Sequence, residues 1–505
     1  MFVNKINKLF LFGLFLLLVG FSLLYVEFDL IELMESIPAF LNFIFVDFLP
    51  PNFSDVALYV KPFMNSIYFA VVSTVFSSSF ALVFSLCMAH NTTPHPFVRL
   101  FVRSVITFFR NIPFLIWASL LVVIFGVGTL PGLIALIIFS TSFLSRFYAG
   151  SIEEVNCEAL EALDACGASY FQKVKHAVLP QFLPSFYSWT LFNFEITIRA
   201  SAILGLVGAG GLGTILKQTM DLFQYGKTST VIIIFIVLIV VVEQVTKKIK
   251  KQIMMSTKRL SSYHIIFVFL FVLSFYQLDL SFSQFQAGIN RLFTIVPQFF
   301  QWSFSDISEL VNGMIISLIV AFLSIVLSIG IAIILAFLSA RNTTPNYYVG
   351  IVVNFILMII RAIPATIWVL LAVSSIGFGS VAGVLGLIFP TTSFLVKSFS
   401  SQIEEVGKEG VEALQAVGGT WWHIVFKGFV PILFTKFLAT TFFRFEINVA
   451  ESVIFGMVGV GGIGLFIQGY ISFYDFSHLS VSILIVFTTM FVLEVTANHI
   501  RKRLS

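Results

Sequence analysis

The chain has 505 residues, of which 58% are hydrophobic and 11% are charged, and its formal net charge is +4. A soluble domain carries roughly 25% charged residues, so this composition excludes a soluble enzyme as well as collagen-like, disulfide-stapled and disordered proteins. Apolar stretches recur from end to end, which also excludes a soluble enzyme with one membrane anchor. The cysteines, Cys87, Cys157 and Cys166, have the spacing of no metal site. We therefore expect an all-α polytopic membrane protein.

Long apolar stretches predict about twelve membrane-spanning helices, six in each half of the chain. The first, at 9–26, carries no charge and approaches the roughly 20 residues that a helix needs to cross a bilayer. No small-residue cleavage site follows it before Glu27, so we expect a retained span and not a signal peptide. The other spans are expected near 63–89, 104–125, 131–149, 184–206, 228–246, 264–280, 314–339, 355–376, 381–399, 435–457 and 479–497.

The distribution of charge predicts the orientation of the spans. Six acidic residues and no Lys or Arg lie in the stretch 27–55, whereas six basic residues and no acid lie in the linker 247–259. Basic flanks stay on the cytoplasmic side of a membrane. The N-terminus, the linker and the basic C-terminus (501–503) are therefore expected in the cytoplasm, and the acidic stretch outside.

A shift of 251 residues aligns the sequence with itself. Asn91-Thr-Thr-Pro94 meets Asn342-Thr-Thr-Pro345, and 12 of the 30 residues at 151–180 are identical to those at 402–431 without a gap. We therefore predict two parallel six-span repeats, which would place a pathway on the pseudo-twofold axis along the membrane normal. The predicted repeats are residues 1–251 and 252–505.

The loop between the fourth and fifth spans of each repeat is predicted to form short cytoplasmic helices near 152–167 and 403–418. Ser151 and Glu154 match an S-x-x-E capping box, which can start a helix, and Gly167 permits a turn after it. The sequence E-A-x-x-x-x-G occurs in both copies, thirteen residues before a proline. We expect these helices to dock into a soluble partner. The alternative is an amphipathic loop helix that lies on the lipid headgroups.

The duplicated loop resembles the EAA motif of bacterial ABC importer permeases, in which it is the coupling helix that inserts into the ATPase subunit. The third motif residue is Leu in both copies where Ala is usual, and Val430 replaces a Leu in the second copy, yet the spacing is kept. The resemblance implies ATPase-coupling roles for residues of both loops. These are Glu158, Glu161, Ala162 and Gly167 in the first copy, and Glu409, Glu412, Ala413 and Gly418 in the second.

The segments that follow each loop resemble phosphonate-type permeases more narrowly. They run from Glu195 to Gly213 and from Arg444 to Gly464, and an Arg-x-Ile-Pro…Trp element precedes them at Arg110 and Arg361. The resemblance covers nearly all of each half. It implies a type I ABC importer permease in a bacterial inner membrane, in contact with lipid, two ATPase subunits and an extracytoplasmic binding protein. Such subunits usually pair as homodimers, so the fused repeats are expected to replace the homodimer.

Ionisable residues within spans are costly in a bilayer and usually line a pathway or pair with one another. Glu195 and Arg199 are four residues apart and share a helix face, whereas the second half has Ala450 at the position of Arg199. This divergence favours an asymmetric site whose arginine forks meet a phosphoryl anion. The alternatives are mutual neutralisation and, for Arg110 and Arg361, snorkelling to the headgroups. The candidate pathway residues are Glu195, Arg199, Arg444, Glu446, Arg110 and Arg361.

Glycine-rich runs follow the fifth span of each repeat. Both match the dinucleotide fingerprint G-x-G-x-x-G, but that fingerprint requires a βαβ unit, which these spans do not provide. We reject nucleotide binding here and expect a tight turn or gate at the outer face. The residues concerned are Gly208, Gly210, Gly211 and Gly213 in the first run, and Gly459, Gly461, Gly462 and Gly464 in the second.

Sequence signals of an energy source or a catalytic centre are missing. The chain has no G-x-x-x-x-G-K-[ST] sequence, so ATP is expected to bind only to partner subunits. We also expect no cofactor, metal or nucleic acid to bind the chain. The sequence therefore predicts a non-enzymatic permease subunit of an ABC importer for phosphonate or a related oxyanion, phosphite or phosphate. The alternatives are a permease for another anion or an amino acid, an ion-coupled carrier with parallel repeats, and a membrane enzyme or scaffold.

Overall fold

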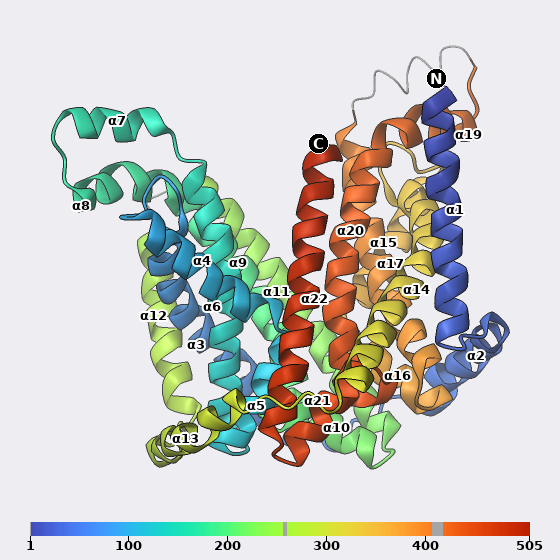
Figure 1. Cartoon of the computed structure of the whole chain (residues 1–505), viewed down its shortest axis with the longest axis horizontal. Helices are drawn as coiled ribbons and strands as arrows, with labels where there is room; N and C mark the ends of the chain where they lie inside the picture. The colour runs from blue at the N-terminus through green and yellow to red at the C-terminus, as the bar shows by residue number, and fades with distance from the viewer. Residues whose placement is uncertain (1, 256–259, 407–417, 505) are drawn as a thin grey trace. The chain divides into compact units, whose positions relative to one another are not determined.

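The computed structural model describes residues 2–255, 260–406 and 418–504, and most of these residues lie in helices (Figure 1). The chain divides into two compact units. We call residues 48–298 the N-unit, and residues 1–47 together with 299–505 the C-unit.

The N-unit is a bundle of long apolar helices in which α3 lies along α6, and α6 packs against α9. Its short helices α7 and α8 project at one end of the bundle (Figure 1). Its helices are α3 (Val56–Met88), α4 (Pro96–Asn111), α5 (Phe114–Phe125), α6 (Thr129–Glu153), α7 (Cys157–Ala165), α8 (Tyr170–Lys173), α9 (Leu179–Leu204), α10 (Leu212–Asp221), α11 (Tyr225–Met255), α12 (Leu260–Gln277) and α13 (Phe282–Ile295).

The C-unit repeats this arrangement with α14 along α17, and α17 against α20. The start of α1, the end of α22 and α19 lie at the same end of this unit (Figure 1). Its helices are α1 (Phe2–Tyr25), α2 (Leu30–Asn42), α14 (Ile307–Ser339), α15 (Tyr347–Ala362), α16 (Ala365–Ile376), α17 (Ser380–Glu405), α19 (Trp421–His423), α20 (Val430–Phe455), α21 (Ile463–Ser472) and α22 (Phe476–Leu504).

Small residues let the central helices of each bundle pack closely. They recur along α3 and α14 at helical spacing, and each is at most 2% exposed. Small side chains permit close approach of helix backbones within a membrane. A serine hydroxyl can also bond within its own helix, as that of Ser324 does to the Ala321 carbonyl at 2.8 Å. The residues are Ser66, Ala70, Ser73, Ser77 and Ala81 in α3, and Ser317, Ala321, Ser324, Ser328 and Ala332 in α14.

Among the described residues, eight helices are long and apolar enough to cross a membrane, and four further bent pairs bring the number to twelve if each pair is one span. The predicted number of about twelve therefore agrees with the structure. Hydropathy did not predict that four of the spans are bent pairs of helices. The bends are 69° between α1 and α2, 89° between α4 and α5, 76° between α12 and α13, and 87° between α15 and α16.

Proline causes two of these bends. Ile112 and Ile363 precede Pro113 and Pro364 and have extended backbones, with ψ of 123° and 124°. A residue before proline avoids the helical region because the proline ring clashes with its backbone. The Ile-Pro pair therefore ends one helix and starts the next at a new angle.

The first bent pair of each predicted repeat packs in the compact unit formed mainly by the other repeat. In the C-unit, Tyr25 donates a hydrogen bond to Asn312 at 2.6 Å, and Phe40 stacks on Phe389 with 5.4 Å between ring centroids. In the N-unit, Phe271 of α12 meets Phe76 at 5.8 Å, and Gln284 of α13 donates to the Phe125 carbonyl at 2.9 Å. The compact units are thus a different division of the chain from the predicted repeats.

Replacement of Phe40 by Ala should loosen the attachment of α2 to its bundle. Phe40 is 2% exposed and stacks on Phe389, and removal of a buried phenylalanine ring costs on the order of 3 kcal/mol. We expect a lower melting temperature of the purified chain in detergent, measured by intrinsic fluorescence. Phe45→Ala is the matched control, because Phe45 is 67% exposed. Equal melting temperatures for the two variants would contradict the assignment of α2 to the C-unit.

Candidate functional site

The first predicted coupling loop contains the short helix α7, which starts later than the sequence predicts. Its N-cap is Asn156, whose side-chain oxygen accepts a hydrogen bond from the Glu158 N–H at 2.8 Å. The predicted capping box at Ser151 is wrong, because α6 continues past it with Ile152 fully buried against the bundle. Burial of the last turn of α6 stabilises Ser151 in a helical conformation. A capping motif in the sequence contains no information on burial, so it could not predict this.

A tight turn ends α7. Gly167 has a φ of +73°, in the left-handed region that glycine adopts without steric cost. The Ala168 N–H donates to the Leu163 carbonyl at 3.0 Å, which satisfies a carbonyl at the helix end. Lys173 then lies 2.6 Å from Asp164 and ties α8 to α7. The turn and the ion pair give the loop a defined shape.

The first coupling loop presents an exposed, acidic surface. None of the α7 residues is buried, although Leu160 packs partly against the bundle core. The predicted coupling residues Glu158, Glu161, Ala162 and Gly167 are all exposed. Of the second copy, Glu409, Glu412 and Ala413 lie outside the described residues, whereas Gly418 is exposed and has a φ of +76°.

A buried polar cluster lies inside the C-unit bundle, and we call it the α20 cluster. Arg444 is 5% exposed, and its guanidinium lies 2.8 Å from Glu451 and 5.4 Å from the centre of the Phe394 ring. Asn448 donates to Thr391 at 2.9 Å and to Ser324 at 3.0 Å. The guanidinium also donates to Thr391 at 3.4 Å. The α20 cluster consists of Ser324, Thr391, Arg444, Asn448 and Glu451.

The sequence prediction did not include Glu451 or Asn448 as site residues. Glu451 follows Arg444 by seven residues, which is two helical turns and places both side chains on one face. A search at seven-residue spacing would have found the pair.

The corresponding positions in the N-unit carry no charge. Asn193 stands where α20 has Arg444, and Ala200 stands where it has Glu451. Asn193 and Thr197 are fully buried, and Thr197 lies 3.5 Å from the Thr74 hydroxyl. At these two positions one bundle therefore holds an ion pair, and the other holds neutral side chains.

The remaining predicted pathway residues are half-buried. Glu195 accepts a hydrogen bond from Thr246 and lies 4.0 Å from Lys250, both on α11. Lys250 belongs to the basic end of α11, so Glu195 faces that end of the bundle. The other half-buried residues are Arg199, Glu446, Arg110 and Arg361.

The Arg-x-Ile-Pro…Trp element lies at the bend between α4 and α5 in the N-unit and between α15 and α16 in the C-unit. Arg110 and Arg361 lie in the last turns of α4 and α15, where a positive charge is favourable. Trp117 donates its indole N–H to the Phe109 carbonyl at 3.3 Å. In the C-unit, Trp368 donates in the same way to the Ile360 carbonyl at 3.2 Å. The tryptophan therefore satisfies a carbonyl at the end of the preceding helix.

The glycine-rich runs form tight turns between α9 and α10 and between α20 and α21. Six of the eight glycines have φ between +76° and +108°: Gly208, Gly210, Gly211, Gly459, Gly461 and Gly462. Gly213 and Gly464 permit close packing, since a Cβ atom would lie 1.8 Å from the Ala202 carbonyl oxygen or 2.0 Å from that of Val453. The Leu212 N–H donates to Ser66 at 3.0 Å, and the Ile463 N–H donates to Ser317 at 3.2 Å.

The end of each bundle away from the coupling loop carries a charged network. In the N-unit, Lys227 lies 2.6 Å from Asp55. In the C-unit, His478 occupies the equivalent position and bonds to Asp475 at 2.6 Å and to Ser303 at 2.8 Å. Asp306 accepts from Tyr470 and from Ser305, each at 2.8 Å, and these hydrogen bonds lower the pKa of Asp306.

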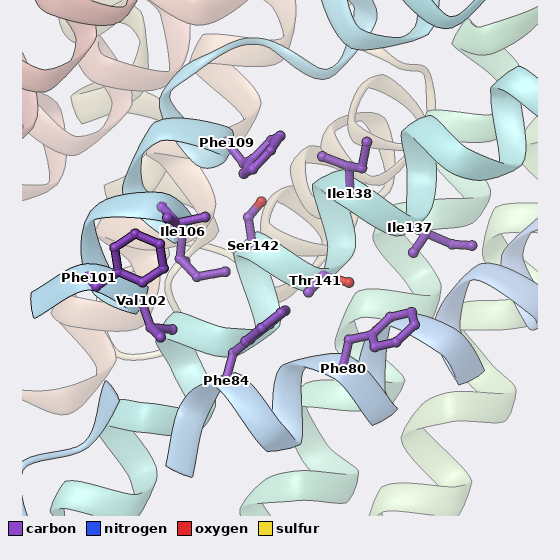
Figure 2. Close-up of a pocket in the computed structure, with 11 residues that line it drawn as sticks. Phe80, Phe84, Phe101, Val102, Ile106, Phe109, Ile137, Ile138, Thr141 and Ser142 are labelled. Atoms are coloured by element: carbon purple, nitrogen blue, oxygen red, sulfur yellow. The ribbon is translucent and has the colours of Figure 1, made fainter. Parts of the chain in front are cut away.

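An apolar groove of about 370 Å³ lies between α3, α4 and α6 of the N-unit (Figure 2). Phenylalanine rings form much of its wall, and Thr141 and Ser142 supply hydroxyls. The groove includes none of the predicted site residues. An anion would lose its hydration in such a lining without compensation, so the groove is not an oxyanion site. The lining includes Phe80, Phe84, Phe101, Phe109, Thr141 and Ser142.

Comparisons with known proteins agree with the duplicated bundle. The chain matches the family "Binding-protein-dependent transport system inner membrane component" at residues 81–254 and 328–505. It is 27% identical to the phosphate-import permease protein PhnE of Mycolicibacterium smegmatis, over 90% of this chain and 87% of that protein. It is 34% identical to the phosphite transport system permease protein PtxC of Stutzerimonas stutzeri, over 37% of this chain and 67% of that protein.

Among solved structures, the chain is similar to one of the inward-facing MetNI methionine ABC transporter. The match has 22% identity and a TM-score of 0.37, and it covers 40% of this chain and 98% of that chain.

The family match defines the type of subunit. Its two segments cover more than half of the sequence and include both coupling loops. A permease of this type works with ATPase and binding-protein partners, and it has no catalytic domain and no cofactor of its own. Among the described residues, no group of three or more His, Cys, Asp or Glu could hold a metal ion. The chain belongs to the family of inner membrane components of binding-protein-dependent transport systems, and it is an ABC importer permease.

Proposed function

We propose that this ABC importer permease carries a phosphorus oxyanion, namely phosphate, phosphite or phosphonate. The α20 cluster is the observation that carries the proposal. A guanidinium inside a spanning helix is costly to bury, and its planar fork of N–H donors matches the oxygens of a phosphoryl group. The names of two relatives, a phosphate and a phosphite permease, support the same class of cargo.

Arg444 would bind the anion, and its guanidinium would pair with the Glu451 carboxylate when no cargo is bound. Breaking a buried ion pair is costly because one charge is left alone, but an incoming oxyanion supplies a replacement for the carboxylate. Thr391 and Asn448 add neutral donors beside the guanidinium. We further propose that Glu195, Arg199, Glu446, Arg110 and Arg361 line the pathway before or after this site.

Two ATPase subunits would bind the coupling loops, with Glu158 and Glu161 of α7 in the first contact surface. The glycine-rich turns would form the outer gate, where a binding protein delivers its ligand. Both chain termini are then cytoplasmic, in agreement with the basic flanks. The repeats 1–251 and 252–505 would together replace a homodimer. A different small solute remains the alternative cargo.

Changes to the α20 cluster should abolish uptake without preventing assembly. The chain itself offers a neutral version of the cluster, because the N-unit has Asn193 and Ala200 at these positions. We expect Arg444→Asn combined with Glu451→Ala to fold, since it removes both charges of the pair. Uptake of radiolabelled phosphate by cells should fall to background, and copurification with the ATPase should persist.

The single change Arg444→Lys keeps the charge and removes the fork of donors. Loss of one charged hydrogen bond costs about 1.5–3 kcal/mol, so we expect the KM for phosphate uptake to rise about tenfold or more. Unaltered KM and maximal rate in both the single and the double variant would refute a role of the α20 cluster in binding the cargo.

Glu161→Ala should weaken the contact with the ATPase. Glu161 is exposed on α7, so its removal leaves the bundle intact and affects only what binds there. We expect less ATPase to copurify and ATP-driven uptake to fall several-fold. Glu154→Ala is the matched control, because Glu154 is also exposed but precedes α7. If both variants behave like the original chain, α7 is not the ATPase contact.

A further inference from the structure

The repeated Asn-Thr-Thr-Pro sequence has no place in the function proposed so far. It lies in the loop between α3 and α4, and again in the loop between α14 and α15. Asn91 donates a side-chain hydrogen bond to the Ile152 carbonyl at 2.6 Å. Asn342 makes the same bond to the Ile403 carbonyl at 2.7 Å. Both acceptors are fully buried residues in the last turns of α6 and α17.

A second hydrogen bond runs in the opposite direction in both units. The side chain of Glu153, at the end of α6, accepts the His90 N–H at 3.1 Å. Glu404 of α17 accepts the Arg341 N–H at 2.9 Å. The Ile152 and Ile403 carbonyls also accept a backbone N–H, from Val155 at 3.2 Å and from Val406 at 3.3 Å. The asparagine is therefore a second donor to each carbonyl, while the glutamate holds the loop. We call this pair of bonds the loop clamp.

The loop that carries the clamp is itself fixed. Thr92 donates to the Leu86 carbonyl at 2.8 Å, and Thr343 donates to the Phe337 carbonyl at 2.8 Å. These bonds join each loop to the end of the central helix before it, α3 or α14. A displacement that reaches the clamp is therefore transferred to the central helix and is not absorbed within the loop.

The clamp lies directly before the coupling loop. In the N-unit, α6 ends at Glu153 and α7 begins at Cys157. In the C-unit, the chain beyond the second coupling loop also contacts the loop that carries the clamp, because Trp421 donates its indole N–H to the Thr343 carbonyl at 2.8 Å. The central helices also pack directly against α6 and α17, so the clamp adds a fixed polar link at the helix end to this apolar packing.

We propose that Asn91 and Asn342 are positioning residues that transmit displacement of the coupling loops to the central helices α3 and α14. The proposal rests on the proposed function, because it assumes that the ATPase subunits move these loops. The asparagine acts through a buried carbonyl and touches neither ATP nor cargo. The same geometry in both units indicates that each half of the permease has its own clamp.

The test uses Asn91→Asp and Asn342→Asp, which keep the size of the side chain and remove the donor. The complex of the full chain with its ATPase and binding protein is placed in liposomes, and ATP hydrolysed per phosphate ion imported is measured. We expect this ratio to rise about fivefold or more, which is the scale of a lost coupling between two sites. Asn91→Ala and Asn342→Ala remove the donor without a new charge and serve if an aspartate prevents assembly.

Thr93→Ala and Thr344→Ala are matched controls. Their hydroxyls bond within the loop, to the His95 carbonyl at 3.2 Å and the Asn346 carbonyl at 2.9 Å. They should keep the original ratio. Hydrogen exchange over residues 150–167 of the permease alone gives a second readout, and it should become faster in the Asn91 variants only.

Faster exchange with an unchanged ratio would overturn the proposal, because the clamp would then be purely structural. Unchanged exchange and an unchanged ratio would overturn it as well. If the complex with the unaltered chain hydrolyses ATP but imports no phosphate, the result would contradict the proposed cargo and not the proposed role of the clamp. In that case, loss of the stimulation of the ATPase by the binding protein in Asn91→Asp, but not in Thr93→Ala, would support the proposed role of the clamp. Stimulation that persists in both variants would contradict it.

Discussion

Backbone groups at buried helix ends must find partners inside the protein, because neither a packed bundle nor the hydrocarbon of a bilayer gives them access to water. This constraint accounts for most of what the two bundles share. Each bundle has a bent span, a glycine-rich turn and a helix end before the coupling loop, and a side chain satisfies the backbone at each place. The side chains are Trp117 and Trp368 at the bends, Ser66 and Ser317 at the turns, and Asn91 and Asn342 at the helix ends.

Residues that form no hydrogen bond to a helix end can differ in type between the two halves. The residues of the α20 cluster are of this kind. Arg444 and Glu451 have neutral counterparts in the N-unit, although both bundles keep the serines and alanines that let their central helices approach. A homodimer cannot diverge in this way, since one sequence supplies both halves. Two repeats in one chain can therefore carry an arginine–glutamate pair at these two positions in one bundle only, while the shared backbone geometry is retained in both.

Periodicity and hydropathy predicted the positions of the spans because burial in lipid requires long apolar stretches. They did not predict the bends, although Ile112-Pro113 gave a local reason for one of them. The capping box at Ser151 failed because burial of Ile152 outweighs a local cap. Glu451 was missed because pairs were sought at four-residue spacing. The packing of residues 1–47 with 299–505 could not be read from the sequence, since similarity between repeats does not say which bundle a span contacts.

The exchange of the first bent pairs places a polar network soon after each passage of the chain between the compact units. The chain passes between the compact units at residues 47–48 and again at 298–299. Soon after the first passage, the Asn52 N–H donates to the Gly226 carbonyl at 2.8 Å, and Asp55 pairs with Lys227. Soon after the second, Ser303 and Asp306 join the network of His478 and Tyr470.

Each passage is therefore tied to the start of the last span of the unit that it enters, α11 or α22. The tie is made by a lysine in the N-unit and by a histidine in the C-unit. As in the bundle interior, the backbone arrangement is shared and the side chains differ.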